Sequence, residues 1–357
     1  MKKYLLKAAL LSLSAFAFVA CSNDDDPDGP KPVPEVSYGM FVVNSGNQSK
    51  KIDGSLDYID FVSNKITNNV FKTANGRSIG LTANDAVVYG SKVYIAVSAE
   101  NTIEIIDSKT FRSLAQVKTD NSPRHIVAQD GKVYVSNYGG FVTRVDTLSM
   151  KADGKAEVGD YPEGMTALNG KLYVANSAYG AGTTVSVIDM ATFKKTTDLE
   201  VPTNPVLLAN DGTNLYLATQ GKYKADYSGY DEDPALYKMA TDGKTTKIMN
   251  ADAMSLVDGT IYTFTCNYYN PEISFAKYDT KSGATTKMDL KGIDYPCAIG
   301  VDPVTKHIWV SSYNLSDYGY ADYSAAGYIC EFGTDGVGLN KYNTGVGPIG
   351  IYFYNNK

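Results

Sequence analysis

The stretch Asp130-Gly131-Lys132-Val133-Tyr134-Val135 decides the fold, because close copies of it recur along the chain. The nearest copy is Asn169-Gly170-Lys171-Leu172-Tyr173-Val174, and weaker copies surround the other anchor aromatics. The seven anchors are Phe41, Tyr94, Tyr134, Tyr173, Tyr216, Tyr262 and Trp309, spaced 39 to 53 residues apart. Repeats of this length are typical of solenoids and propellers.

Each repeat contains the signals of four short strands. A proline, for example Pro123, opens an apolar strand eleven residues before the anchor, and an Asp-Gly or Asn-Gly pair joins the two as a hairpin. A third strand ends in aspartate, as in Thr102–Asp107, and a fourth closes the unit. No helical period is visible after the N-terminal segment. We therefore predict an all-β fold, a seven-bladed β-propeller of four-stranded blades.

The two ends of the repeat region are half-units. The tail Pro348–Tyr354 repeats the proline and the first strand and then stops, while Phe41 opens the region in mid-unit. The simplest closure pairs the C-terminal strand with the N-terminal blade, which leaves no free sheet edge. A β-sandwich or a solenoid is the alternative, and neither accounts for the two half-units.

The N-terminal segment carries targeting signals. Three lysines precede Ala8–Ala20, an apolar run of thirteen residues that is shorter than the roughly 20 a bilayer-spanning helix needs. The run ends at Cys21 and resembles a lipobox, in which the cysteine is lipidated after cleavage. The acidic run that follows resembles the surface-export signal of Bacteroidetes lipoproteins. An ordinary secretory signal and a solvated linker are the alternatives.

These signals predict three segments. Residues 1–20 are a lipoprotein signal peptide, residues 21–36 a lipidated acidic and Pro-rich tether, and residues 37–357 the propeller. The expected location is the outer membrane, with the lipid-anchored protein facing the cell exterior. Removal of the three signal-peptide lysines takes the formal net charge from −6 to −9, which disfavours nucleic acid as a partner. The lipid then makes the expected membrane contact.

The composition limits metal and redox chemistry. Two histidines are too few for a His-rich metal centre. Cys266, Cys297 and Cys330 remain beside Cys21, and an odd number of this kind leaves at least one thiol unpaired within the chain. Buried free thiols are favoured over one disulfide. We expect no metal and no cofactor, with Asp226–Asp233 read as a solvated acidic loop rather than a Ca²⁺ site.

One face of the propeller is predicted to bind a ligand. The loops after the anchors vary in length and hold 11 of the 28 tyrosines, together with Asn, Gln, Gly and Ser. Insertions on one face of a repeat protein usually mark its binding face, and this composition is that of antibody paratopes. The candidate ligand-binding residues are Arg124, Asn137, Tyr138, Tyr161, Glu163, Asn176, Tyr179, Asn204, Gln220, Asp252, Asn267, Tyr268, Tyr295 and Tyr313.

The repeats, with their Gly-Lys-Val-Tyr-Val and Gly-Lys-Leu-Tyr-Val strands, resemble the YncE-type seven-bladed propellers. With the lipobox and the acidic run, the chain is most similar to the BtuG lipoproteins of Bacteroidetes. That resemblance implies high-affinity capture of a corrinoid (vitamin B12) as a transported ligand, and delivery to a TonB-dependent outer-membrane transporter of the BtuB type. Tyrosine faces and amides suit the macrocycle, and Arg124 is expected to meet the phosphate of the nucleotide loop.

Three other functions are compatible with the sequence. A surface glycan-binding lipoprotein would also use Tyr and Asn, although it would more often present Trp. A propeller face can serve as a scaffold for protein interaction. A streptogramin-lyase-like enzyme would place His125 and Glu163 at the channel mouth, but a second histidine is missing there because His307 falls on the opposite face. We therefore expect a binding protein, not an enzyme.

Overall fold

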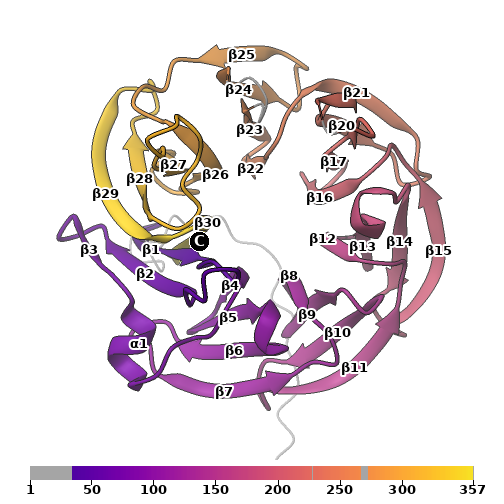
Figure 1. The fold of residues 1–357 in the computed structure, drawn as a ribbon. Helices are drawn as coiled ribbons and strands as arrows, with labels where there is room; N and C mark the ends of the chain where they lie inside the picture. The colour runs from indigo at the N-terminus through magenta and orange to yellow at the C-terminus, as the bar shows by residue number, and fades with distance from the viewer. Residues whose placement is uncertain (1–33, 227, 267–271, 357) are drawn as a thin grey trace, which may run out of the picture. The chain divides into compact units, whose positions relative to one another are not determined.

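The described strands form a ring of blades. The structure is a computed structural model that describes residues 34–226, 228–266 and 272–356. Residues 35–357 form one compact unit. Seven four-stranded sheets stand around a common centre in this unit (Figure 1). The prediction of an all-β, seven-bladed propeller is confirmed.

Each blade runs from an inner to an outer strand. Blade one is β30 (Pro348–Asn355), β1 (Ser37–Asn44), β2 (Ser55–Asp60) and β3 (Lys65–Thr67). Blade two is β4 (Ala83–Tyr89), β5 (Lys92–Val97), β6 (Thr102–Asp107) and β7 (Ser113–Lys118). Blade three is β8 (Pro123–Gln129), β9 (Lys132–Asn137), β10 (Phe141–Asp146) and β11 (Lys151–Glu157). Blade four is β12 (Pro162–Leu168), β13 (Lys171–Asn176), β14 (Thr184–Asp189) and β15 (Lys194–Glu200).

The remaining blades follow the same order. Blade five is β16 (Pro205–Asn210), β17 (Leu215–Thr219), β20 (Ala235–Met239) and β21 (Thr245–Asn250), with a small hairpin, β18 (Lys222–Tyr223) and β19 (Tyr230–Glu232), inserted after β17. Blade six is β22 (Ser255–Val257), β23 (Thr260–Cys266), β24 (Ile273–Asp279) and β25 (Thr285–Met288). Blade seven is β26 (Tyr295–Val301), β27 (Ile308–Tyr313), β28 (Ala326–Phe332) and β29 (Gly338–Val346).

The two ends of the chain close the ring as the half-units predict. The C-terminal strand β30 is the inner strand of blade one and pairs antiparallel with β1, with Phe41 opposite Tyr352. Figure 1 shows this yellow strand against the indigo one. The closure gives blade one four strands, as many as each other blade has, so no inner strand remains unpaired.

The residues that recur in each repeat form the turns between strands. In the first copy, Asp130 and Gly131 have φ of 50° and 74°, the left-handed pair that a type I′ hairpin requires. The aspartate that ends a third strand caps the next turn: Asp189 Oδ1 accepts hydrogen bonds of 2.8 Å from the backbone N–H and the hydroxyl of Thr192. Side chains thereby take up backbone donors that the sheet leaves unpaired.

The anchors fill the spaces between blades. Six of the seven are buried: Phe41, Tyr94, Tyr134, Tyr173, Tyr216 and Trp309. Trp309 of blade seven stacks on Phe61 at the end of β2, with ring centroids 5.4 Å apart, so the anchor of one blade joins it to the next. Burial of large aromatic side chains is the main favourable term in such a core.

Short helices interrupt the all-strand pattern. The helix α1 (Val70–Asn75) lies between blades one and two and buries Val70 and Phe71. Its six residues are too few to show a helical period, and they account for part of the longest anchor spacing, 53 residues. Two 3₁₀ turns, η1 (Ser98–Glu100) and η2 (Ala178–Gly180), follow second strands. Among the described residues, no helix has the length and hydrophobicity to cross a membrane.

Candidate functional site

One face of the propeller is hollowed near its centre. A cavity of about 440 Å³ is lined by residues of blades three to seven. They come from the starts of inner strands and from the loops after second strands, and the latter are the loops that the sequence assigned to the binding face. The lining consists of Arg124, His125, Tyr138, Glu163, Ser177, Tyr179, Gly180, Asn204, Val206, Leu207, Gln220, Tyr223, Asp252, Ala253 and Cys297.

The structure brings together half of the predicted ligand-binding residues. The seven that line the cavity are Arg124, Tyr138, Glu163, Tyr179, Asn204, Gln220 and Asp252. Tyr161 lies beside them, with its ring between those of Tyr138 and Tyr179. Four blades contribute these residues, because each blade presents the same two connections to this face.

Two predicted asparagines do not reach the cavity. Asn137 and Asn176 end the second strands of blades three and four and are buried. The Nδ2 of Asn137 donates to the carbonyl of Val135 at 2.7 Å, and that of Asn176 donates to Ser186 Oγ at 2.9 Å. Their amides are used inside the blades, since a residue at the last position of a buried strand faces backbone groups that need partners.

The other predicted residues lie elsewhere. Tyr295 and Tyr313 face each other across β26 and β27 with ring centroids 6.3 Å apart, and neither lines the cavity. Asn267 and Tyr268, and the predicted lipidation site Cys21, lie outside the described residues.

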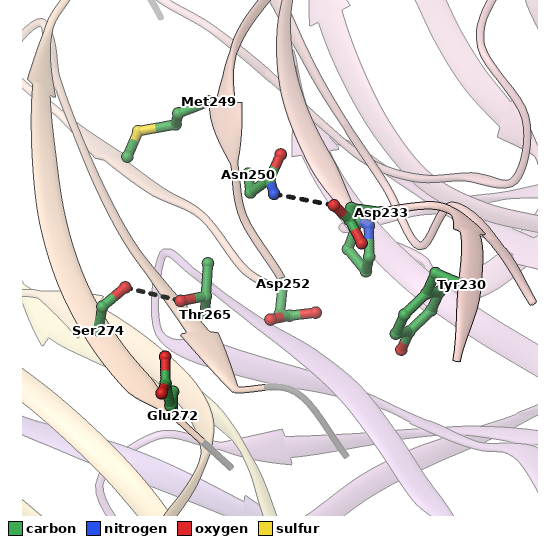
Figure 2. A pocket seen from close by; sticks show the side chains of 9 residues that line it. Tyr230, Asp233, Met249, Asn250, Asp252, Thr265, Glu272 and Ser274 are labelled. Atoms are coloured by element: carbon green, nitrogen blue, oxygen red, sulfur yellow. Dashed lines mark hydrogen bonds between the residues drawn. The ribbon is translucent and has the colours of Figure 1, made fainter. Parts of the chain in front are cut away.

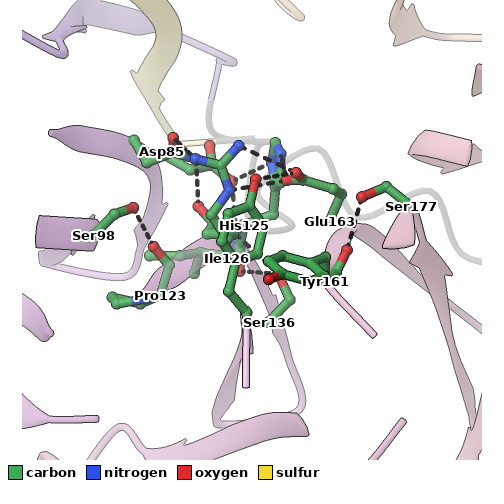
Figure 3. Close-up of polar contacts among 12 residues, drawn as sticks. Asp85, Ser98, Pro123, His125, Ile126, Ser136, Tyr161, Glu163 and Ser177 are labelled. Atoms are coloured by element: carbon green, nitrogen blue, oxygen red, sulfur yellow. Dashed lines mark hydrogen bonds and ion pairs between the residues drawn. The ribbon is translucent and has the colours of Figure 1, made fainter. Parts of the chain in front are cut away.

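A cluster of charged side chains lies at one side of the cavity. Arg124 makes a two-pronged ion pair with Glu163, with Nε–Oε2 and Nη2–Oε1 distances of 3.0 and 3.2 Å. Figure 3 shows His125 between Asp85 and Glu163, with Nδ1 3.1 Å from Asp85 Oδ2 and Nε2 3.4 Å from Glu163 Oε2. Two basic and two acidic side chains give this ionic cluster a formal charge of zero with His125 protonated.

The cluster sets the protonation of its members. Burial acts to lower the pKa of His125, but hydrogen bonds to Asp85 and Glu163 outweigh it and raise the pKa to about 9. Burial acts to raise the pKa of Glu163, but the hydrogen bond from His125 and the charge of Arg124 lower it to about 2. At neutral pH His125 is therefore a cation and Glu163 an anion.

The cluster and its hydrogen-bond partners join four blades. Asp85 of β4 accepts a 2.8 Å hydrogen bond from the backbone N–H of Ile126 and another from the hydroxyl of Tyr352 on β30. Glu163 of β12 accepts a 2.6 Å hydrogen bond from the hydroxyl of Tyr138. Charge-assisted bonds of this kind are stronger than neutral ones, so the inner strands of blades one to four hold this side of the cavity in one geometry.

Arg124 is already paired within the protein. Its guanidinium also donates to Asn84 Oδ1 at 2.5 Å and lies 4.5 Å from the centre of the Tyr138 ring. A phosphate would therefore have to compete with the carboxylate of Glu163 for the same donors. The geometry makes Arg124 a support for the cavity wall, and its replacement disturbs the fold as well as any ligand contact.

A second cavity of about 430 Å³ lies between blades five and six (Figure 2). Its lining includes the carboxylates of Asp233, Asp252 and Glu272. Asp252 borders both cavities. Burial raises the pKa of Asp252, the charge of Asp233 raises it further, and the backbone N–H of Cys266 opposes the shift.

The described thiols are free, and the described acidic groups are not clustered around a common point. Cys266, Cys297 and Cys330 are free, and burial raises the pKa of the Cys297 thiol to about 12, so it stays protonated. Within residues 34–226, 228–266 and 272–356, no group of three or more His, Cys, Asp or Glu side chains is arranged to hold a metal ion. In the Asp226–Asp233 loop, Asp226 accepts hydrogen bonds from Ser228.

Sequence reasoning missed the residues that support the site. Asp85, Ser177 and Cys297 carry no local signal, because Asp85 is one aspartate in an ordinary strand and Ser177 follows a strand like many serines. Their common feature is a position within a few residues of the start of a first strand or the end of a second strand. Applying that positional rule to every blade would have found them.

A family model described as "Domain of unknown function (DUF5074)" matches residues 38–330. The chain belongs to this DUF5074 family. A comparison with curated proteins finds no match. Among solved structures, this DUF5074 chain is similar to hydrazine synthase of Kuenenia stuttgartiensis, with a TM-score of 0.59 and 16% identity over 76% of this chain and 89% of that one.

The DUF5074 chain is also similar to the computationally designed Ika8 protein, with a TM-score of 0.51 and 10% identity over 74% of this chain and 88% of that one. Identities this low show a common fold and carry nothing about activity. The function of this DUF5074 protein has to be argued from its own cavity.

Proposed function

We propose that this protein captures a corrinoid on the hollowed face of the propeller and passes it, without chemical conversion, to a TonB-dependent outer-membrane transporter. The observation that carries the proposal is the lining of the 440 Å³ cavity, where tyrosine rings and amide side chains from several blades lie beside a charge-neutral ionic cluster. A corrinoid is a broad, partly apolar macrocycle fringed with amides. Ring faces suit its apolar surface, and Asn204 and Gln220 suit its amides.

The size and charge of the site agree with this ligand. The volume lies in the range of about 300–1,000 Å³ usual for small-molecule sites, and the cavity is open, so a ligand as large as a corrinoid would fill it and extend over its mouth. The negative net charge of the chain, −6, disfavours polyanions and tolerates a neutral, amide-rich molecule. Several blades would share the contacts, since nanomolar capture needs about −12 kcal/mol.

The N-terminal sequence supports the location of this function. The run before Cys21 and the acidic residues after it resemble the signals of a lipoprotein displayed at the cell surface. A surface lipoprotein meets scarce nutrients before the transporter does, and a transporter docked over the same face would receive the ligand without its release into bulk solution.

Titration of residues 22–357 with cyanocobalamin tests the proposal, by calorimetry and by co-elution of the red ligand on gel filtration. Saturable 1:1 binding at micromolar concentration or better is expected. Gln220→Ala in the cavity should weaken it, while Gln129→Ala, at the last position of β8 near the opposite face, should leave it unchanged. No heat and no colour at high micromolar concentration would overturn the proposal, and a glycan array would then test the glycan-binding alternative.

A further inference from the structure

Three tyrosine rings form a continuous row along one wall of the cavity. The Tyr138 and Tyr161 ring centroids are 5.0 Å apart, and those of Tyr161 and Tyr179 are 5.3 Å apart. These three residues are the tyrosine ladder. Exposure rises along it, from the partly buried Tyr138 to Tyr161 at 40% and Tyr179 at 80%. The ladder thus leads from the protein interior to solvent.

The inner end of the ladder is fixed by the ionic cluster. The guanidinium of Arg124 lies over the Tyr138 ring, and the Tyr138 hydroxyl donates to Glu163 at 2.6 Å. Each further ring packs against the one before. An exposed ring that is supported in this way loses little side-chain freedom when a ligand covers it, which favours binding.

The backbone holds the outer two rings in an unusual conformation. Tyr161 and Tyr179 have φ of 46° and 57°, a left-handed region that bulky side chains rarely adopt. The two loops are tied together, because the backbone N–H and the hydroxyl of Ser177 both donate to the carbonyl of Tyr161, at 3.2 and 2.9 Å (Figure 3).

The outermost ring contacts little else. Tyr179 lines the cavity, and 80% of its surface is exposed, while its ring packs at an angle of 54° to that of Tyr161. Tyr318 on blade seven is as exposed, at 88%, but it does not line the cavity. A fixed, uncovered aromatic face at the edge of a cavity is the arrangement of an interface hot spot before its partner arrives.

We propose that Tyr179 is a stacking platform for a flat conjugated face of the ligand, with Tyr161 and Tyr138 as its supports. The inference rests on the proposed function, which supplies the class of ligand. What it adds is the residue that determines specificity. A corrinoid offers two such faces, the conjugated part of the corrin ring and the aromatic base of its nucleotide tail. Cobinamide lacks that base, so comparison of the two ligands separates them.

The test is a calorimetric titration of residues 22–357 with cyanocobalamin and with dicyanocobinamide. Tyr179→Ala is expected to weaken binding about tenfold, the usual effect of removing one aromatic stacking partner. Tyr179→Phe should stay within about threefold of wild type, because the ring and not the hydroxyl does the stacking. Tyr318→Ala is the matched control and should bind as wild type does. Circular dichroism and melting curves confirm that each variant is folded.

The titrations show which face of the ligand stacks on Tyr179 and whether the platform exists. If Tyr179→Ala loses affinity for cyanocobalamin alone, the platform stacks on the nucleotide base. If it loses affinity for both ligands, the platform stacks on the corrin ring. Unchanged affinity of Tyr179→Ala, or an equal loss in Tyr179→Phe, overturns the platform. If wild type binds neither corrinoid, the proposed function fails. The platform is then tested with protoporphyrin IX, and it is overturned if no binding depends on the Tyr179 ring.

Discussion

Replacement of Glu163 by glutamine should destabilise the propeller, because it removes the carboxylate that joins Arg124 to His125. Glu163 is 7% exposed, and removal of one member of a buried ion pair costs about 3–5 kcal/mol. The Arg124 side chain is 21% exposed and keeps its hydrogen bond to Asn84, so we expect the lower end, about 3 kcal/mol. At about 2 °C per kcal/mol for a domain of this size, Tm should fall by about 6 °C.

Thermal unfolding followed by circular dichroism at neutral pH measures this fall. Asp289→Asn is the matched control, since Asp289 forms an exposed pair with Lys291 and should change Tm by about 1 °C or less. The double variant Arg124→Gln with Glu163→Gln should recover part of the loss, because no charge is then left without its partner. A Glu163→Gln protein that melts within 1 °C of wild type would refute the argument that the ionic cluster supports the cavity.

Four further outcomes follow from the structure. The pKa of His125 is raised from 6.5 to about 9, so its stabilisation is full below pH 6.5 and is lost as the pH rises through 9; His125→Gln should remove that decline from melting curves recorded across this range. Trp309, the single tryptophan, is 1% exposed, so its fluorescence should shift to longer wavelength on unfolding, and Trp309→Ala should cost about 3–5 kcal/mol in denaturant titration. Deletion of residues 348–357 removes the inner strand of blade one and should abolish cooperative unfolding, whereas a chain that still melts sharply would contradict the closure. Tyr179→Gly should melt above Tyr179→Ala, since only glycine adopts φ of 57° without strain.

Much of the fold could be predicted from local signals. The Asp130-Gly131 turn needs only two residues with positive φ, and the aspartates that end third strands need only a turn to cap. Because these marks recur with each blade, the number of blades and the closure by β30 followed from counting. The helix α1 could not be found in this way, because its six residues are held by packing of Phe71 against neighbouring blades.

The candidate site was predicted in part. The face was found because loop length and tyrosine content are local properties. The contacts of single residues were not: the sequence suggested that Arg124 would meet a ligand phosphate and that Asn137 would contact the ligand. Glu163 is 39 residues from Arg124, and no local pattern shows that the two meet at 3.0 Å.

The sequence alone therefore determined the architecture of this protein and the face on which its function is expected, since both depend on short-range turn chemistry repeated along the chain. Only the tertiary structure decided which side chains share the cavity, which are used up inside the blades, and that Arg124 and His125 are neutralised by Glu163 and Asp85. The physical reason is that burial and pairing of charges depend on contacts between blades. These contacts join residues about 40 positions apart, beyond the reach of any local signal.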